Sequence, residues 1–151
     1  MLAGATTSSG NLFTRLSQDT RLPTVIHCVG GTDRTCLAVA LLLTALGVDR
    51  ELVLDDYQLS DQYRGAPRLP HVISLFVAAG LGQEAAQAVL SSPRWAMAAA
   101  LDEVDKTHGG IENYLPGAAG TTAQTLAALK DTLPCRSQRA APGDRRLRIS
   151  D

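Results

Sequence analysis

A short run of strand-forming residues is followed directly by a glycine-containing loop and then by a long apolar segment. In residues 22–26, Val25 and Ile26 follow a proline, which is typical of the start of a buried strand. Residues 34–46 are apolar at nearly every position, and Gly47 follows them. A helix that is apolar on all sides is buried, and glycine commonly ends a helix. The order strand, loop, helix predicts an α/β fold.

The rest of the chain reads as mainly helical. Asp49 is expected to cap a helix that runs to about residue 63. Thr121 or Thr122 is expected to begin a last helix that runs through residue 133. Further helices are expected over residues 12–20, 71–79, 83–90, from Ser92-Pro93 to Gly109-Gly110, and for one turn over 111–115. We therefore expect a loose arm over residues 1–11, one domain over 12–133, and a disordered basic tail over 134–151.

Composition excludes several classes of protein. The 151 residues are 45% hydrophobic and carry a net charge of -1, which suits one globular core and argues against nucleic-acid partners. No apolar run reaches the roughly 18–20 residues that a membrane span needs. The three cysteines lie far apart in an odd set, and the histidines are not paired with them. We expect a cytoplasmic protein without disulfides, metal or organic cofactor.

The loop over residues 27–35, HCVGGTDRT, has the features that hold a phosphoryl group. Cys28 would stand at the end of the strand, and the loop amides would point inward as an anion-binding nest, supported by the helix N-terminus. This field favours thiolate over thiol, so Cys28 should be nucleophilic near neutral pH. The expected substrate-binding residues are Val29, Gly30, Gly31, Thr32 and Arg34.

Three side chains around Cys28 have further expected roles. Arg34 would grip two phosphate oxygens with its planar guanidinium group, which lysine cannot do. Thr35 can donate a hydrogen bond to the Cys28 sulfur, which helps that sulfur leave from a phosphocysteine. His27 would point away from the substrate and hold the loop through the backbone. Catalytic roles are thus predicted for Cys28, Arg34 and Thr35.

The stretch HCVGGTDRT resembles the signature of the protein tyrosine phosphatase superfamily. More narrowly, it is similar to the bacterial and fungal tyrosine or lipid phosphatases whose loop usually reads HC-x-x-GKDRTG. The segments LLLTALGV (residues 41–48), DDYQLS (55–60) and GGIENYL (109–115) match later parts of that family, so residues 12–133 are covered. The resemblance implies hydrolysis of phosphotyrosine-type monoesters through a phosphocysteine.

The chain departs from this family in its loop. Thr32 stands where the family usually has lysine, which removes one positive charge from the rim and disfavours phosphoinositides and doubly charged phosphates. Cys36 replaces a glycine. It is expected to pack at the start of the buried helix, and the alternative is a redox partner that protects Cys28 from over-oxidation.

We expect the sheet to be truncated at its N-terminal side. Family members carry about a hundred residues before this loop, whereas 27 residues precede Cys28 here. A lone strand leaves backbone groups unpaired on both edges. We expect either a missing upstream segment, with this chain as the C-terminal part of a larger product, or a second copy in a homodimer to complete the sheet.

The general acid for the leaving oxygen has one main candidate. Asp33 lies inside the loop, and its alternative role is structural, as a carboxylate that accepts loop hydrogen bonds or pairs with arginine. The segment Asp55-Asp56-Tyr57 could approach the loop or form a solvated face. Other residues have these expected positions: Arg64 and Arg68 beside the substrate or in a solvated loop, His71 and His108 as ordinary helix residues, Trp95 and Phe76 in the core.

Three functional hypotheses follow. The first is a cysteine-dependent phosphatase acting on a phosphorylated protein or small phosphate ester. The second is a weak or inactive remnant that binds inorganic phosphate, motivated by Thr32 and the missing strands. The third is a sulfur-transfer or arsenate-reducing enzyme, which fits less well because there is no resolving cysteine pair. The residues leave open which phosphate ester is the substrate.

Overall fold

The computed structural model describes residues 2–18, 23–63 and 69–133, and their side chains from residue 9 onward. Every regular element in this described part is an α-helix. The helices are α1 (Leu2–Leu16), α2 (Asp33–Ala45), α3 (Arg50–Tyr63), α4 (Leu69–Ala78), α5 (Gln83–Val89), α6 (Arg94–His108), α7 (Ile111–Gly117) and α8 (Ala123–Thr132). The predicted basic tail and the predicted roles of Arg64 and Arg68 lie outside the described residues.

The α/β prediction is wrong for the described part of the chain, which contains no strand. Residues 23–28 run without regular secondary structure from the first helix toward α2. Val25 is 86% exposed, so its β-branched side chain does not enter a core. A strand is defined by hydrogen bonds to a neighbour, and no second extended segment in the described ranges offers them. Local propensity alone therefore did not make a strand.

Helix ends follow the sequence signals closely. Gly47 has φ 81° after α2, where the N–H groups of Gly47 and Val48 donate to the carbonyls of Thr44 and Leu43 at 3.0 Å. This pair of bonds is the Schellman ending, which requires a left-handed residue and so favours glycine. At the start of α3 the Asp49 carboxylate accepts a hydrogen bond from the Glu51 N–H at 2.9 Å, as predicted.

Helix α8 is also capped as predicted, by Thr122. Helix α1, in contrast, is longer than predicted. Thr122 accepts a hydrogen bond from the Thr125 N–H at 3.1 Å at the start of α8. Helix α1 begins at Leu2 rather than at Leu12. The small polar residues that precede Leu12 are weak helix formers, but they do not break a helix.

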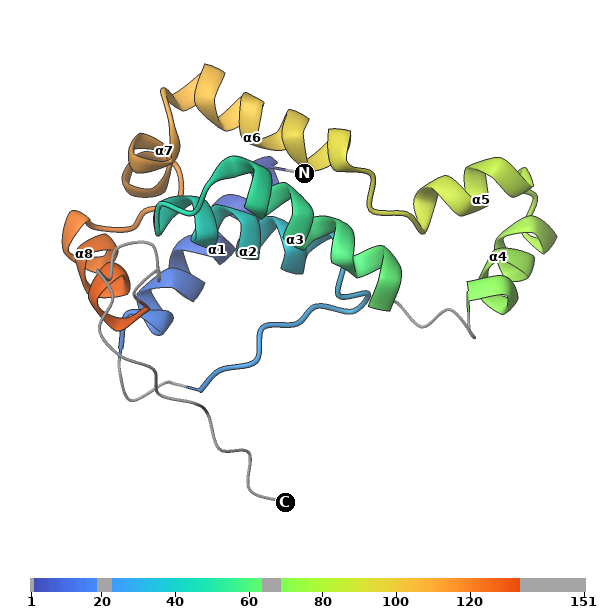
Figure 1. Cartoon of the computed structure of the whole chain (residues 1–151), viewed down its shortest axis with the longest axis horizontal. Coiled ribbons are helices and arrows are strands. Elements are labelled where there is room, and N and C mark those ends of the chain that lie inside the picture. Colours follow the sequence, from blue (N-terminus) through green and yellow to red (C-terminus); the bar gives the residue numbers. More distant parts are fainter. Residues whose placement is uncertain (1, 19–22, 64–68, 134–151) are drawn as a thin grey trace, which may run out of the picture.

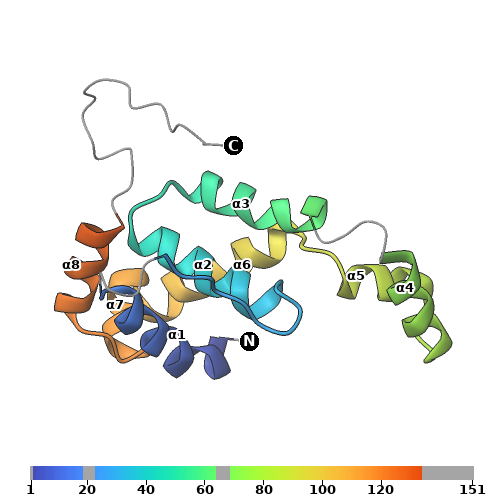
Figure 2. The same ribbon diagram turned by 90° about the horizontal axis from the view of Figure 1, so that it is seen from below.

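Helix α2 lies at the centre of the main bundle (Figures 1 and 2). It packs against α1, α3 and α7, while α3 packs on α6, α6 on α7, and α1 on α8. Burial of each large apolar side chain contributes about 1.5–3 kcal/mol. The fully buried apolar core side chains come from all parts of the bundle: Phe13, Leu41, Val53, Val104, Tyr114, Leu115 and Leu129.

Two arginines fix α3 against α6. Arg50 of α3 pairs with Asp102 and Asp105 of α6, and Arg94 of α6 pairs with Glu51 and Asp55 of α3. These carboxylates are mostly exposed, so each pair contributes at most about 1 kcal/mol. The two sets use the first two turns of α3 but lie near opposite ends of α6, and together they define how the two helices are aligned.

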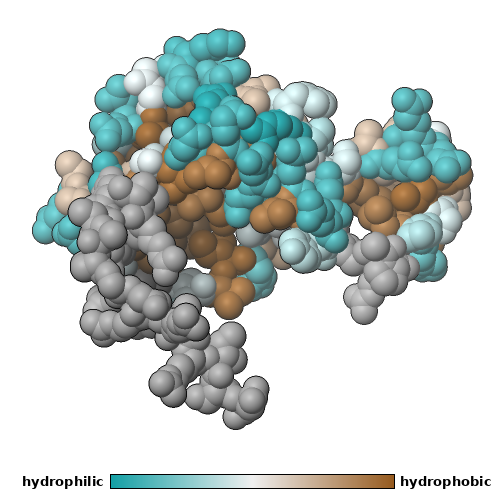
Figure 3. Space-filling model, in the orientation of Figure 1, coloured by the Kyte–Doolittle hydropathy of each residue, from teal (hydrophilic) through white to brown (hydrophobic). Residues whose placement is uncertain are grey.

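Helices α4 and α5 pack against each other and project from the bundle (Figures 1 and 2). No residue of α4 is buried, although the helix is apolar, and Leu75 is 57% exposed. The space-filling view shows hydrophobic side chains on this pair and over a hollow in the main bundle (Figure 3). Trp95 is 74% exposed, so its predicted core position is wrong. Among the described helices, none is long and apolar enough to cross a membrane.

Gly10 provides a direct test of this packing. A Cβ atom added to Gly10 would lie 1.7 Å from the carbonyl oxygen of Ala119, in the segment that leads to α8. We expect Gly10→Ala to lower the free energy of unfolding by about 1–3 kcal/mol, because backbone must move to relieve the overlap. Urea denaturation followed by circular dichroism measures this change.

The matched control is Gly117→Ala, because no atom lies within 4 Å of a Cβ added at this position. This control should leave stability unchanged or raise it by up to about 1 kcal/mol. Equal stability of Gly10→Ala and the wild type would contradict the close approach of α1 to the Ala119 segment.

Candidate active site around Cys28

The candidate site lies where residues 23–32 meet the N-terminus of α2. Cys28 is partly buried and its thiol is free. The backbone bends over residues 29–32, and α2 begins at Asp33. Gly31 adopts φ 74°, a left-handed conformation that glycine takes without strain. The loop therefore turns back on itself and brings the start of α2 toward Cys28.

Several donors face the Cys28 sulfur. The Gly31 N–H donates to Sγ at 3.1 Å. The Thr35 hydroxyl is buried, faces the sulfur, and makes no regular hydrogen bond within the described part of the chain. The Thr35 hydroxyl lowers the pKa of Cys28 most strongly, burial opposes it, and the backbone N–H groups of Thr35, Gly31 and Gly30 add to the lowering. The resulting Cys28 pKa is about 7, so close to half of the thiol is ionised at neutral pH.

The other loop residues divide into one buried and several exposed side chains. Thr32 is 4% exposed, and its hydroxyl donates to the Gly30 carbonyl at 3.3 Å, so it braces the loop from within. The exposed ones are His27, Val29, Asp33 and Arg34. Arg34 has no ion-pair partner among the described residues and is free to meet an anion from solvent. The structure thus brings Cys28, Gly30, Gly31 and Thr35 together and leaves Asp33 and Arg34 at the surface beside them.

Tyr57 lies near the loop, whereas the sequence left open whether the segment Asp55-Asp56-Tyr57 approaches the loop or forms a solvated face. Its side chain is buried, and burial is the main cause that raises its pKa, with Cys36, Asp33 and Asp61 adding negative charge nearby. Tyr57 is thus a neutral hydroxyl close to the start of α2. The spacing of Val53 and Tyr57 places both on one face of α3, and this face is the buried one.

The remaining candidates lie elsewhere. Asp55 is held by Arg94, and Asp56 is exposed, which agrees with a solvated face. His71 is exposed on α4, and the ring of His108 packs edge-on against Tyr114 at 5.0 Å. No three His, Cys, Asp or Glu side chains converge as a metal site within residues 9–18, 23–63 and 69–133.

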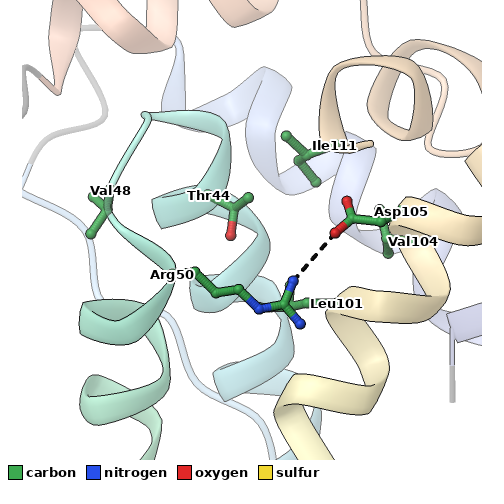
Figure 4. A pocket seen from close by; sticks show the side chains of 7 residues that line it. All are labelled: Thr44, Val48, Arg50, Leu101, Val104, Asp105 and Ile111. Carbon is green, nitrogen blue, oxygen red and sulfur yellow. Dashed lines mark hydrogen bonds and ion pairs between the residues drawn. The ribbon is translucent and has the colours of Figure 1, made fainter. Parts of the chain in front are cut away.

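A pocket of about 210 Å³ lies between the C-terminal end of α2, the start of α3, α6 and the start of α7 (Figure 4). Arg50 reaches across it to Asp105, as the close-up shows. Its other lining side chains are mainly apolar: Thr44, Val48, Leu101, Val104 and Ile111. No residue of the loop over residues 27–35 lines this pocket, so the pocket is not part of the Cys28 site.

Comparison with known proteins identifies the class. A model of the tyrosine phosphatase family matches residues 1–134, so the chain belongs to this family. It is 30% identical over 123 residues to the triple specificity protein phosphatase PtpB of Mycobacterium tuberculosis, an alignment that covers 74% of this chain and 44% of that protein. A protein of Cupriavidus necator, whose name marks it as a predicted tyrosine-protein phosphatase, is 31% identical over 91 residues, 60% of this chain and 33% of its own length. The chain thus spans less than half the length of these curated relatives.

The environment of Cys28 predicts its reactivity. Alkylation of Cys28 by iodoacetamide should reach half its maximal rate near pH 7, because the thiolate is the reacting form and the Cys28 pKa is about 7. Trypsin cleaves after Arg21 and Arg34, so mass spectrometry can follow Cys28 separately from Cys36. Thr35→Val should move the midpoint to higher pH, because the hydroxyl that favours the thiolate is lost.

Thr35→Ser is the matched control, since it retains the hydroxyl and should leave the midpoint close to that of the wild type. A midpoint for Thr35→Val equal to that of Thr35→Ser would show that the hydroxyl does not act on the sulfur.

Proposed function

We propose that this chain carries the nucleophilic and phosphate-binding part of a cysteine-dependent phosphatase that hydrolyses phosphotyrosine-type monoesters. The supporting observation is the convergence of the Gly31 N–H and the Thr35 hydroxyl on Cys28, with the lowered pKa that results. Membership of the tyrosine phosphatase family agrees with this chemistry. The name of the mycobacterial relative states three specificities for that protein, which supports a phosphate ester as substrate here.

The proposed reaction has two displacement steps. The Cys28 thiolate attacks phosphorus, an S–P bond forms, the ester P–O bond breaks, and the leaving oxygen takes a proton from the proposed acid, Asp33. Water then gives a proton to the Asp33 carboxylate and attacks the phosphocysteine; an O–P bond forms, the S–P bond breaks, inorganic phosphate leaves and Cys28 returns as thiolate. Arg34, which is exposed beside the loop, would bind two phosphate oxygens, and the loop amides would bind the third. Thr35 would stabilise the departing sulfur in the second step.

Mutation of the nucleophile and of the arginine tests this mechanism. With para-nitrophenyl phosphate, Cys28→Ser should lower turnover by at least about 10³-fold, because a serine hydroxyl is hardly ionised near pH 7. Arg34→Lys should lower it by about 10²-fold or more, since lysine keeps the charge but loses the bidentate geometry. Cys36→Ser is the control for loss of the other thiol near the loop, because the serine hydroxyl can still donate a hydrogen bond to the Gly31 carbonyl. Turnover that survives Cys28→Ser would refute the mechanism.

A second candidate is a phosphate-binding remnant without turnover. The observation in its favour is that the loop is approached by residues 23–28 without a regular element, while Val25 and Val29 are 86% and 95% exposed. In this case orthovanadate or inorganic phosphate would raise the melting temperature of the chain, and para-nitrophenyl phosphate would not be hydrolysed. Measurable turnover that depends on Cys28 would reject the remnant and support the phosphatase.

A further inference from the structure

A continuous path of contacts leads from Cys28 to the connection between α5 and α6. The Gly31 N–H donates to the Cys28 sulfur at 3.1 Å, and on the other side of the same residue the Gly31 carbonyl accepts from the Cys36 thiol at 3.6 Å. The Cys36 sulfur in turn lies 3.2 Å from the Ser60 hydroxyl of α3. Gly31 is therefore held between the candidate nucleophile and a side chain that α3 supports.

The next residue of α3 continues the path. The Asp61 carboxylate accepts a hydrogen bond from the Ser92 N–H at 2.7 Å. The Ser92 side chain is completely buried, and its hydroxyl faces Tyr57 without a hydrogen bond of regular geometry. Tyr57 and Asp61 are four residues apart and share one face of α3, so both contact the same point of the α5–α6 connection. This contact immobilises the last turns of α3, where Ser60 also lies.

We propose that Ser60 and Asp61 are positioning residues for the candidate active site: Asp61 anchors the end of α3 to Ser92, and Ser60 holds Cys36, which binds the carbonyl of Gly31 and thereby positions the residue whose N–H faces Cys28. The proposal rests on the proposed function of the loop and adds residues to it that lie outside the HCVGGTDRT stretch. Neither residue would touch the substrate.

The direction in which the Cys28 pKa moves when Asp61 is removed distinguishes a positioning role of Asp61 from an effect of its negative charge alone. The charged and titratable groups that act on Tyr57 of α3 are Asp33 and Cys36 of α2 and Asp61 of α3, so Asp61 lies close to the contact between α3 and the start of α2. If Asp61 acted only through its negative charge, its removal would lower the pKa of Cys28, because a thiolate is repelled by nearby negative charge. If Asp61 positions the Gly31 N–H, its removal raises the Cys28 pKa, because donors to the sulfur are lost.

The test measures the pH midpoint of Cys28 alkylation by iodoacetamide on the tryptic peptide of residues 22–34. Asp61→Ala should raise the midpoint by about 0.5 pH unit, which is about a threefold lower ratio of thiolate to thiol. Asp61→Asn should restore the wild-type midpoint, because its amide oxygen still accepts from the Ser92 N–H. The control is Asp56→Ala, which removes the same charge from an exposed position of the same helix.

Hydrogen exchange at the Ser92 amide gives the second readout, with faster exchange expected in Asp61→Ala and wild-type exchange in Asp61→Asn. A midpoint of Asp61→Ala at or below that of the wild type would overturn the proposal, and so would an equal rise in Asp61→Asn. If Asp61→Ala does not fold, the test uses Ser60→Ala, which removes the contact to Cys36. An unchanged pH midpoint of Cys28 alkylation in Ser60→Ala would then refute the proposal. None of these readouts needs turnover, so a wild-type chain without phosphatase activity would contradict the proposed function and leave this test intact.

Discussion

The candidate site depends on the orientation of α2, because the loop before it and its first turn together supply the groups that favour a thiolate at Cys28. A sulfur anion at the surface needs N–H and O–H donors directed at it, and such donors lose their effect when they move by about an ångström. Here they come from Gly31, Gly30 and Thr35. The buried face of α2 holds them in place, because Leu37 and Leu41 are anchored in the core of the bundle.

The surrounding helices restrict α2 from both ends. At its C-terminal end the Gly47 turn leads directly into α3, and Arg50 and Arg94 fix α3 on α6. At its N-terminal end α3 returns beside the loop, where Ser60 contacts Cys36. The loop is thus supported by a helix that follows it in sequence, although its own N-terminal approach has no regular structure. This arrangement explains how residues far from the motif can affect the chemistry of Cys28.

Structural features that depend only on residues close in the sequence were predictable. The glycine after α2, the caps Asp49 and Thr122, and the buried character of α2 depend on local backbone geometry and periodicity, and the structure confirms them. Features that depend on distant partners were not predictable. The strand at residues 22–26 was expected from β-branched residues, yet no partner strand exists in the described ranges. Trp95 was expected in the core, but its position on α6 faces solvent.

The site follows the same division. The grouping of Cys28, Gly31 and Thr35 follows from their spacing in one loop. The approach of α3 depends on how it crosses α2, so the sequence indicated the approach of Tyr57 only as one of two alternatives and did not indicate Ser60. The predicted roles of Asp33 and Arg34 remain predictions, since both side chains are exposed and act only on a bound phosphate.

The central claim is that phosphate passes through Cys28. The most direct measurement is an acid quench of the chain during turnover of para-nitrophenyl phosphate, followed by mass spectrometry of the tryptic peptide of residues 22–34. The account predicts one added phosphoryl group on this peptide, absent from Cys28→Ser. Turnover with no phosphoryl group on this peptide, or with the label on another peptide, would contradict it.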